Sequence, residues 1–418
     1  MRLHIKKLNA SALQFAVLIS VIIIILLGSF ITLTYTHGLF KKQSGVLLQT
    51  IDEANKGIKL SLSEPLNVDV RTTIVDENKG LFIKKNVWGG FIEIESTSEN
   101  NNKMFTQRAL IGEAIKNRNL GIYVSEQKMP LQLVDNAKIV GDAYISDVGI
   151  KSGNIYNTSF NGNTLVYGDI KKSQATLPAL DLFWQQNISD FFNYLPESHY
   201  DYIDLDFRLR NSFDNRTKVI FNQGSMHITS EAVGNIIFKS NSEIIVTSSA
   251  FLEDVFLIAP RVVFEKNFKG TAHVLADTQI KMEENVSLHY PSSLILTDKN
   301  SSLGMPPSNE DEPVFFAPNS NINGVVIYLK NENSENNTNI SIRIDENSTV
   351  FGSVYCEGNL ALNGTVNGNV YTERFIVNLG SKFINYIFNG IIDRKGLNES
   401  FVGLPLQQNK KGIVKWLY

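Results

Sequence analysis

Residues 255–264 read Val255-Phe-Leu-Ile-Ala-Pro-Arg-Val-Val-Phe264, and they align with Ala272-His-Val-Leu-Ala-Asp-Thr-Gln-Ile-Lys-Met282 at a spacing of 17 to 18 residues. A second echo follows, because Gly352-Ser-Val-Tyr355 returns 16 residues later as Gly368-Asn-Val-Tyr371. Short apolar strands that recur at roughly this spacing, with no long helix between them, are typical of a solenoid, whose rungs must stack to bury their apolar faces. We therefore predict a parallel β-helix over residues 219–392.

A β-sandwich is the alternative fold for these strands, although its turns recur every ~8–12 residues. The glycines and asparagines between the strands favour the β-helix, because both residues tolerate the left-handed backbone of its turns. The stretch from Lys299 to Pro318 contains Pro306-Pro307 and interrupts the repeat, which predicts a projecting loop. Residues 393–418 are predicted to form a C-terminal tail or cap, with Trp416 covering the last rung.

The N-terminus holds a long apolar run, with no charged side chain from Leu8 to Thr36. About 20 apolar residues, at ~1.5 Å each in a helix, cross a hydrocarbon core of ~30 Å. We predict that residues 1–36 are a cytoplasmic tip and a transmembrane anchor. A cleaved signal peptide is the alternative, but it would have a shorter apolar core and a small-x-small cleavage site. Lys41 and Lys42 follow the run, so the excess of positive charge before it, which favours a cytoplasmic N-terminus, is small.

The remaining segments are assigned by periodicity. Residues 37–66 are predicted to be a helical connector, 67–178 a β-rich domain, and 179–218 a helix and connector. The stretch from Leu110 to Asn117 is expected to be helical, and Leu180 to Tyr194 is the clearest helix outside the anchor. The fold class is therefore mainly β, with an N-terminal transmembrane helix followed by a β-rich region and a parallel β-helix.

Composition excludes several classes of function. The net charge of −3 supplies no basic field for nucleic acid, and the single cysteine, Cys356, cannot form an intramolecular disulfide or a cysteine-based metal site. The six histidines lack metal-ligand spacing, and the chain has no nucleophile elbow, P-loop or dinucleotide fingerprint. We therefore predict no catalytic, cofactor-binding or metal residue, no cofactor, and a protein that is not an enzyme.

Two acidic clusters and the cysteine are the residues to weigh against this prediction. Asp204 and Asp206, which follow Asp201, would share one face of a strand and could bind calcium or act on a glycan. The alternative is a solvated strand edge. Glu310-Asp311-Glu312 is expected to be a solvated loop, and Cys356 is expected to be a buried small apolar residue.

The anchor resembles the N-terminal helix of type IV pilin-like proteins, especially minor pilins, over Ala10-Ser-Ala-Leu-Gln-Phe15. It lacks the glycine before the cleavage point and the glutamate within the helix that are typical of that group. The Gly- and Asn-rich stretch from Gly352 to Tyr371 resembles bactofilin-type β-helices, which implies stacked rungs.

The body resembles a group of uncharacterised exported proteins of the Bacteroidota, which implies an anchored protein of a surface assembly. That resemblance lies in six short phrases, namely Ile139-Val-Gly-Asp-Ala-Tyr144, Leu165-Val-Tyr-Gly168, Leu252-Glu-Asp-Val255, Ile258-Ala-Pro260, Phe268-Lys-Gly270 and Tyr290-Pro-Ser-Ser293.

Together these features predict a membrane-anchored structural or interaction protein of the cell envelope, in a pilus-like or secretion-associated assembly. Its partners are expected to be membrane lipid, through the N-terminal helix, and envelope proteins, with no nucleic acid. It is expected in the bacterial inner membrane with its body in the periplasm or at the cell exterior. The alternatives are a glycan-binding or carbohydrate-active β-helix protein and an adhesin.

Overall fold

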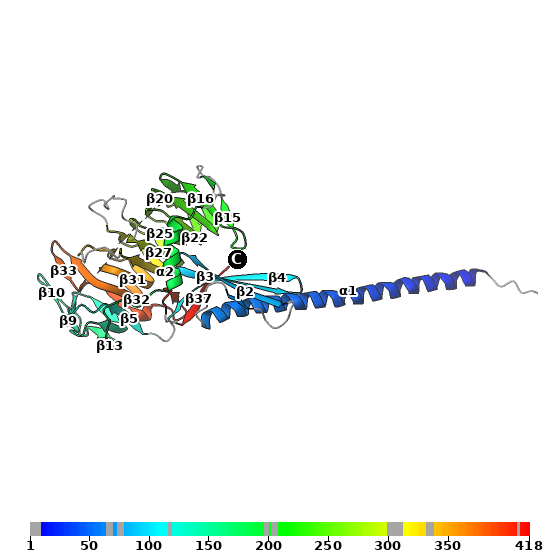
Figure 1. Cartoon of the computed structure of the whole chain (residues 1–418), viewed down its shortest axis with the longest axis horizontal. Coiled ribbons are helices and arrows are strands. Elements are labelled where there is room, and N and C mark those ends of the chain that lie inside the picture. Colours follow the sequence, from blue (N-terminus) through cyan, green and yellow to red (C-terminus); the bar gives the residue numbers. More distant parts are fainter. Residues whose placement is uncertain are drawn as a thin grey trace, which may run out of the picture. The chain divides into compact units, whose positions relative to one another are not determined.

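The structure is a computed structural model, and it describes residues 10–63, 70–72, 79–115, 119–195, 200–201, 208–298, 312–331, 338–407 and 410–418. It is mainly β, with one long apolar helix at the N-terminal end (Figure 1). The chain divides into two compact units, which are described separately. The first comprises residues 1–57, 70–83 and 96–107, and the second comprises 58–69, 84–95 and 108–418.

The first unit is built on helix α1, Ala10–Ser63, which continues past the unit boundary at residue 57. Within the described residues 10–63, the segments assigned from sequence to an anchor and a separate connector form one uninterrupted helix, in which no proline occurs. Gly57 allows the helix to approach a strand closely, since a Cβ atom there would lie 2.0 Å from Ser96 Oγ. The glycine therefore serves packing and does not end the helix.

Four strands follow in the order β1 Val70–Thr72, β2 Lys79–Trp88, β3 Phe91–Asn100 and β4 Lys103–Ala114. The expectation of a helix from Leu110 to Asn117 is wrong, because β4 runs through Ala114. Its second half is held as a strand by the C-terminal strand β37, Lys411–Leu417, which pairs antiparallel with it. The C-terminal tail thus pairs with β4, and Trp416, half-buried, lies opposite Ala109.

The second unit is a parallel solenoid, as predicted, and its strands form a sheet of 23 that nearly closes on itself. Parallel pairing between successive rungs excludes the β-sandwich. One side is formed by β14 Tyr200–Asp201, β16 Lys218–Asn222, β19 Ile236–Ser240, β22 Val255–Ile258, β25 Ala272–Ala276, β27 Ser287–Thr297, β29 Asn321–Leu329, β31 Thr349–Leu362 and β32 Thr365–Asn378.

The other two sides repeat the same stacking. One contains β17 Met226–Ile228, β20 Glu243–Val246, β23 Arg261–Phe264, β26 Gln279–Met282, β28 Val314–Phe316 and β30 Ile342–Ile344. The other begins with β15 Leu209–Asn211, β18 Glu231–Gly234, β21 Phe251–Glu253 and β24 Lys269–Gly270. The interrupting loop expected up to Pro318 lies mostly outside the described residues, and β28 occupies part of its end.

Inward side chains stack from rung to rung and form the core. A continuous buried ladder runs through Phe238, Leu257, Val274, Leu294 and Val326. The two echoes seen in the sequence are in register here, because Gly352 pairs with Gly368 and Tyr355 with Tyr371. Burial of such ladders stabilises the fold by roughly 25 cal/mol per Å² of apolar surface.

Asparagines form one corner of the solenoid in successive rungs. Asn267, Asn285, Asn319 and Asn347 all have positive φ angles, between 60° and 68°. The side chain of Asn285 donates a 3.2 Å hydrogen bond to the side-chain oxygen of Asn267. The abundance of asparagine in the sequence therefore has a structural cause, because few other residues with a side chain adopt this conformation.

The solenoid is extended by rungs from earlier in the chain. After β32 come β33 Lys382–Ile384, β34 Tyr386–Phe388 and β35 Ile391–Asp393, and the next rung is β5 Leu120–Val124, β6 Leu131–Val134 and β7 Lys138–Val140. Val370 pairs with Ile122 and Ile392 with Ile139, both in parallel. A further rung holds β8 Asp142–Ile145, β9 Ile150–Ser152 and β12 Val166–Tyr167, with the small hairpin β10 Asn154–Ile155 and β11 Thr158–Ser159. The last strand of this stack is β13 Ile170–Lys172, which pairs in parallel with β8.

A row of tyrosines on the outer surface of the solenoid contacts the segment of chain that follows β13. Tyr355, Tyr371, Tyr123 and Tyr144 follow one another with ring centroids 6.1, 6.3 and 5.7 Å apart. Their hydroxyls hold the segment that crosses them: Tyr123 donates to the carbonyl of Thr176 at 3.2 Å and Tyr355 to that of Pro178 at 3.2 Å. The row is thus largely covered by the protein's own chain.

This crossing segment leads into helix α2, Leu182–Ile188, and a 3-10 turn, Ser189–Phe192. Asp181 caps the start of α2 by accepting from the backbone N–H of Phe183 and Trp184. Lys239, on the solenoid, donates to three carbonyls at the other end, at 2.6 to 3.1 Å. Desolvation lowers the pKa of Lys239 to about 8. The backbone groups at both ends of this segment are therefore satisfied, and Lys239 fixes its C-terminal end to the solenoid.

Candidate functional site

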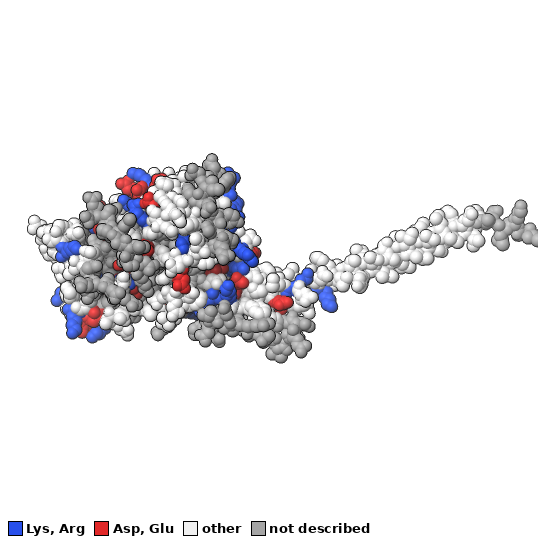
Figure 2. Space-filling view, turned by 45° about the horizontal axis from the view of Figure 1, so that its top comes forward, with Lys and Arg blue, Asp and Glu red and all other residues white. Residues whose placement is uncertain are grey.

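The exposed apolar part of α1 is the feature that a folded protein in water would not leave uncovered. No charged side chain occurs from Ala10 to Phe40, and Leu13, Ile24 and Phe30 are 72%, 67% and 71% exposed. In the space-filling view this length of helix is white (Figure 2). The helix is long and apolar enough to cross a membrane, and a signal sequence has the same properties.

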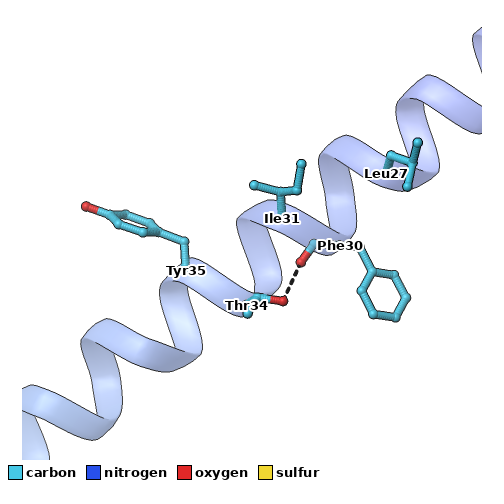
Figure 3. Close-up of a pocket in the computed structure, with 5 residues that line it drawn as sticks. All are labelled: Leu27, Phe30, Ile31, Thr34 and Tyr35. Atoms are coloured by element: carbon cyan, nitrogen blue, oxygen red, sulfur yellow. Dashed lines mark hydrogen bonds between the residues drawn. The ribbon is translucent and has the colours of Figure 1, made fainter.

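The surface of this helix offers a shallow hollow but no enclosed site. Figure 3 shows Leu27, Phe30, Ile31, Thr34 and Tyr35 projecting from α1 around it. All five side chains come from the one helix, so nothing encloses a ligand there. The Thr34 hydroxyl donates a 2.8 Å hydrogen bond to the carbonyl of Phe30.

Three other hydroxyl groups in this stretch are bonded in the same way. Ser20, Ser29 and Thr32 each donate to the carbonyl four residues earlier, at 2.8 to 2.9 Å. A hydroxyl that is satisfied by its own helix costs little in hydrocarbon, because no hydrogen bond to water is lost without replacement. The polar residues of α1 are therefore compatible with a lipid environment.

A glycine turn joins the second unit's part of β2 and β3 to the solenoid. Trp88 Nε1 donates to the carbonyl of Asp254 at 3.0 Å, and the Gly90 N–H donates to Ser293 Oγ at 2.8 Å. From the other side, Trp184 Nε1 of α2 donates to the carbonyl of Gly89 at 3.0 Å. Both indole rings are buried. The turn thus contacts the solenoid and α2 through specific hydrogen bonds.

His273 is fully buried beneath this turn. Its Nδ1 lies 2.9 Å from Ser293 Oγ, and its Nε2 has no hydrogen-bond partner within the part of the chain that the structure describes. A Cβ atom at Gly89, which has φ +56°, would lie 2.5 Å from the imidazole. Desolvation, with a contribution from Lys415, lowers the pKa of His273 to about 3. The imidazole is therefore neutral and serves packing.

Sequence reasoning did not find this junction. The six histidines were weighed from sequence only as metal ligands. The signal that was present is the pair of glycines beside a tryptophan, which permits close approach of a backbone to another surface.

The two acidic clusters and the cysteine singled out from the sequence do not form a common site in the described part of the chain. Asp201 lies in β14, whereas Asp204, Asp206, Glu310 and Asp311 lie outside the described residues. Glu312 forms an ion pair with Arg343. Cys356 is buried, as expected, and desolvation raises the pKa of its thiol. In the described ranges, no three His, Cys, Asp or Glu side chains are placed to hold a metal ion.

No protein-family model matches the chain. No curated protein matches its sequence. Among solved structures, it is similar to the crystal structure of the competence-associated pilin ComZ from Thermus thermophilus, with 8% sequence identity and a TM-score of 0.20, over 89% of this chain and 97% of that chain. A TM-score this low does not establish a common fold, so the likeness carries no argument about function. The bactofilin and Bacteroidota resemblances stay predictions.

Proposed function

We propose that this protein is a single-pass, membrane-anchored structural or interaction component of the bacterial cell envelope, without enzymatic activity. Its folded part lies outside the cytoplasm, in a pilus-like or secretion-associated assembly. The observation that carries the proposal is the exposed, charge-free surface of α1, which continues as one helix into the folded part of the chain. Lipid is the environment in which such a surface is stable, because every backbone group of a helix is satisfied internally.

The folded part supports a role in presenting a surface. The interior of the solenoid is filled with apolar side chains, and the row of tyrosines that a glycan could stack on is largely covered by residues 174–178. A solenoid presents extended outer faces, which suit an interaction with other envelope proteins. Recovery of pilus or secretion subunits after cross-linking in membranes would support this role.

Three arginines in the middle of α1 are expected to release the chain from the membrane. Each arginine at the centre of a span costs about 2.5–3.5 kcal/mol on the insertion scale, so the variant Ile23→Arg, Ile24→Arg, Ile25→Arg should fail to insert. The measurement is the fraction that sediments with membranes after alkaline extraction. The matched variant with leucine at the same three positions should sediment like the natural chain.

Peptide mapping of the membrane-bound protein distinguishes a retained anchor from a cleaved signal sequence. Peptides from residues 10–40 should be present in the mature protein. Loss of those peptides, or equal sedimentation of the arginine and leucine variants, would contradict the anchor.

Labelling of a single introduced cysteine shows on which side of the membrane the solenoid lies. Cys356 is the only cysteine and is buried, so it should not react with a maleimide while the protein is folded. Ser248, by contrast, is exposed on the solenoid. The variant Ser248→Cys should be labelled by a membrane-impermeant maleimide in spheroplasts, whereas the natural chain should be labelled only after denaturation. Labelling of Ser248→Cys only after lysis would place the body in the cytoplasm.

A further inference from the structure

The position of the membrane surface along α1 follows from its charges, if the proposed function holds. Lys41 and Lys42 are exposed and are the first charged residues after the apolar stretch. Lysines at the end of a transmembrane helix extend their side chains to the lipid headgroups, and tyrosines such as Tyr35 are enriched at the same level. The headgroup layer therefore lies near residues 35–42.

The folded part of the first unit begins directly beyond this level. Every side chain of α1 from Ser11 to Gln43 is exposed, Ser44 and Val46 are half-buried, and Thr50 is fully buried. The distance from Lys42 to Ser44 is about 3 Å along the helix axis, at ~1.5 Å per residue. No long spacer thus separates the membrane surface from the residues that pack on α1.

The turn between β3 and β4 reaches toward the same level. Ser96 of β3 lies beside Gly57, and Figure 1 shows the strands running alongside α1 with this turn at the end nearer the N-terminal half of the helix. Five residues of strand, from Ser96 to Asn101, span about 17 Å at ~3.3 Å each. The same length of helix, counted back from Gly57, corresponds to about 11 residues. The turn therefore stands roughly level with Val46, about 6 Å from Lys42 along the axis.

The side chains at this turn suit a lipid surface. Asn101 and Asn102 have φ angles of 47° and 61° and make the tight turn. Lys103 is exposed, and Met104 is apolar yet 71% exposed. Glu99, also exposed, is the acidic residue of this tip and precedes the turn. A basic and an apolar side chain together bind anionic membrane surfaces, through the surface potential and through insertion at the headgroup boundary.

We propose that the β3–β4 turn, Asn101–Met104, is a second membrane contact, which binds anionic phospholipid headgroups through Lys103 and places Met104 at the lipid boundary. The contact rests on the proposed membrane anchor and goes beyond it, because it fixes the tilt of α1 and the orientation of the first unit on the membrane. A single helix alone leaves that orientation free.

Depth measurements on the full chain in lipid nanodiscs test this contact. Fluorophores are attached to Met104→Cys, to Ile24→Cys within the span, and to Ser248→Cys on the solenoid, while the buried Cys356 stays unlabelled. Headgroup-labelled nitroxide lipids should quench Met104→Cys at least about twofold more than Ser248→Cys, and chain-labelled lipids should quench Ile24→Cys. If Ile24→Cys is not quenched, the anchor itself is wrong. If Ile24→Cys is quenched and Met104→Cys matches Ser248→Cys, the second contact is wrong and the anchor stands.

The role of charge is tested by lipid composition and by Lys103. Replacing anionic lipid with neutral lipid, raising the salt concentration, or introducing Lys103→Glu should each reduce quenching at Met104→Cys. The control Lys269→Glu, at another exposed lysine, should leave it unchanged. Quenching that is identical in anionic and neutral lipids would overturn the assignment of anionic headgroups as the ligand.

Discussion

Replacing Gly352 by alanine is expected to destabilise the solenoid by on the order of 3 kcal/mol, because this backbone position admits no Cβ atom. Gly324, Gly352 and Gly368 pair in register across three rungs, with φ angles of +154°, +152° and +153°. A Cβ atom at Gly352 would lie 1.8 Å from the carbonyl oxygen of Gly324. That oxygen belongs to the backbone of the preceding rung, so relief requires the rungs to move apart.

The measurement is the denaturant or thermal unfolding of the full chain in detergent, followed by circular dichroism. Gly224→Ala is the matched control, since no atom lies within 4 Å of a Cβ built at that glycine, and it should shift stability by no more than ~0.5 kcal/mol. Equal stability of the two variants would show that the rungs around Gly352 are not packed as described.

The second large effect is a loss of stability in acid that depends on His273. The pKa of this histidine is about 3 in the folded protein and ordinarily about 6.5 in an unfolded chain. Between these values the unfolded state binds the proton and the folded state does not, so stability is complete above pH 6.5 and falls as the pH is lowered toward 3. At pH 5 the expected contribution of this one group is a loss of about 2 kcal/mol.

The physical reason is the site beneath the glycine turn. Among the residues that the structure describes, an imidazolium there would have no acceptor for its Nε2–H, and it would face the field of Lys415. The variant His273→Leu should therefore show a shallower decline in unfolding midpoint between pH 6.5 and 4 than the natural chain. His289→Gln, at an exposed histidine, should keep the natural slope. Parallel slopes for the natural chain and His273→Leu would contradict this account.

The rungs from residue 219 onward could be predicted from sequence because their signal is local. Gly352 and Gly368 repeat their neighbours after 16 residues, and each apolar strand pairs with the corresponding strand of the next rung. The placement of the rungs at 120–172 beside the late rungs carries no such signal, since it joins distant segments: Gln127 donates to the carbonyl of Glu373, 246 residues further on. Periodicity cannot report a pairing between segments that do not repeat one another.

The candidate anchor could be predicted from the sequence, whereas the contacts around Gly57 and His273 could not. The charge-free run from Leu8 to Thr36 identified the candidate anchor directly, because composition alone determines how a helix partitions into lipid. The continuity of α1 through Gly57 was not predictable, because it depends on the close approach of Ser96, a contact made in the folded state. His273 was missed for the same reason, since its burial depends on Gly89 and Ser293.

The placement of the early rungs beside the late ones has a consequence for the order of folding. A solenoid whose rungs follow the chain grows from any nucleus by adding neighbours. Here β5 can pair with β32 only after β32 has been synthesised, much later in the chain. Closing the long loop between these two strands is therefore a slow step, which comes after most of the solenoid has formed. Until then the strands of 120–172 have no partner on that side, and they are the part of the nascent protein most in need of a chaperone.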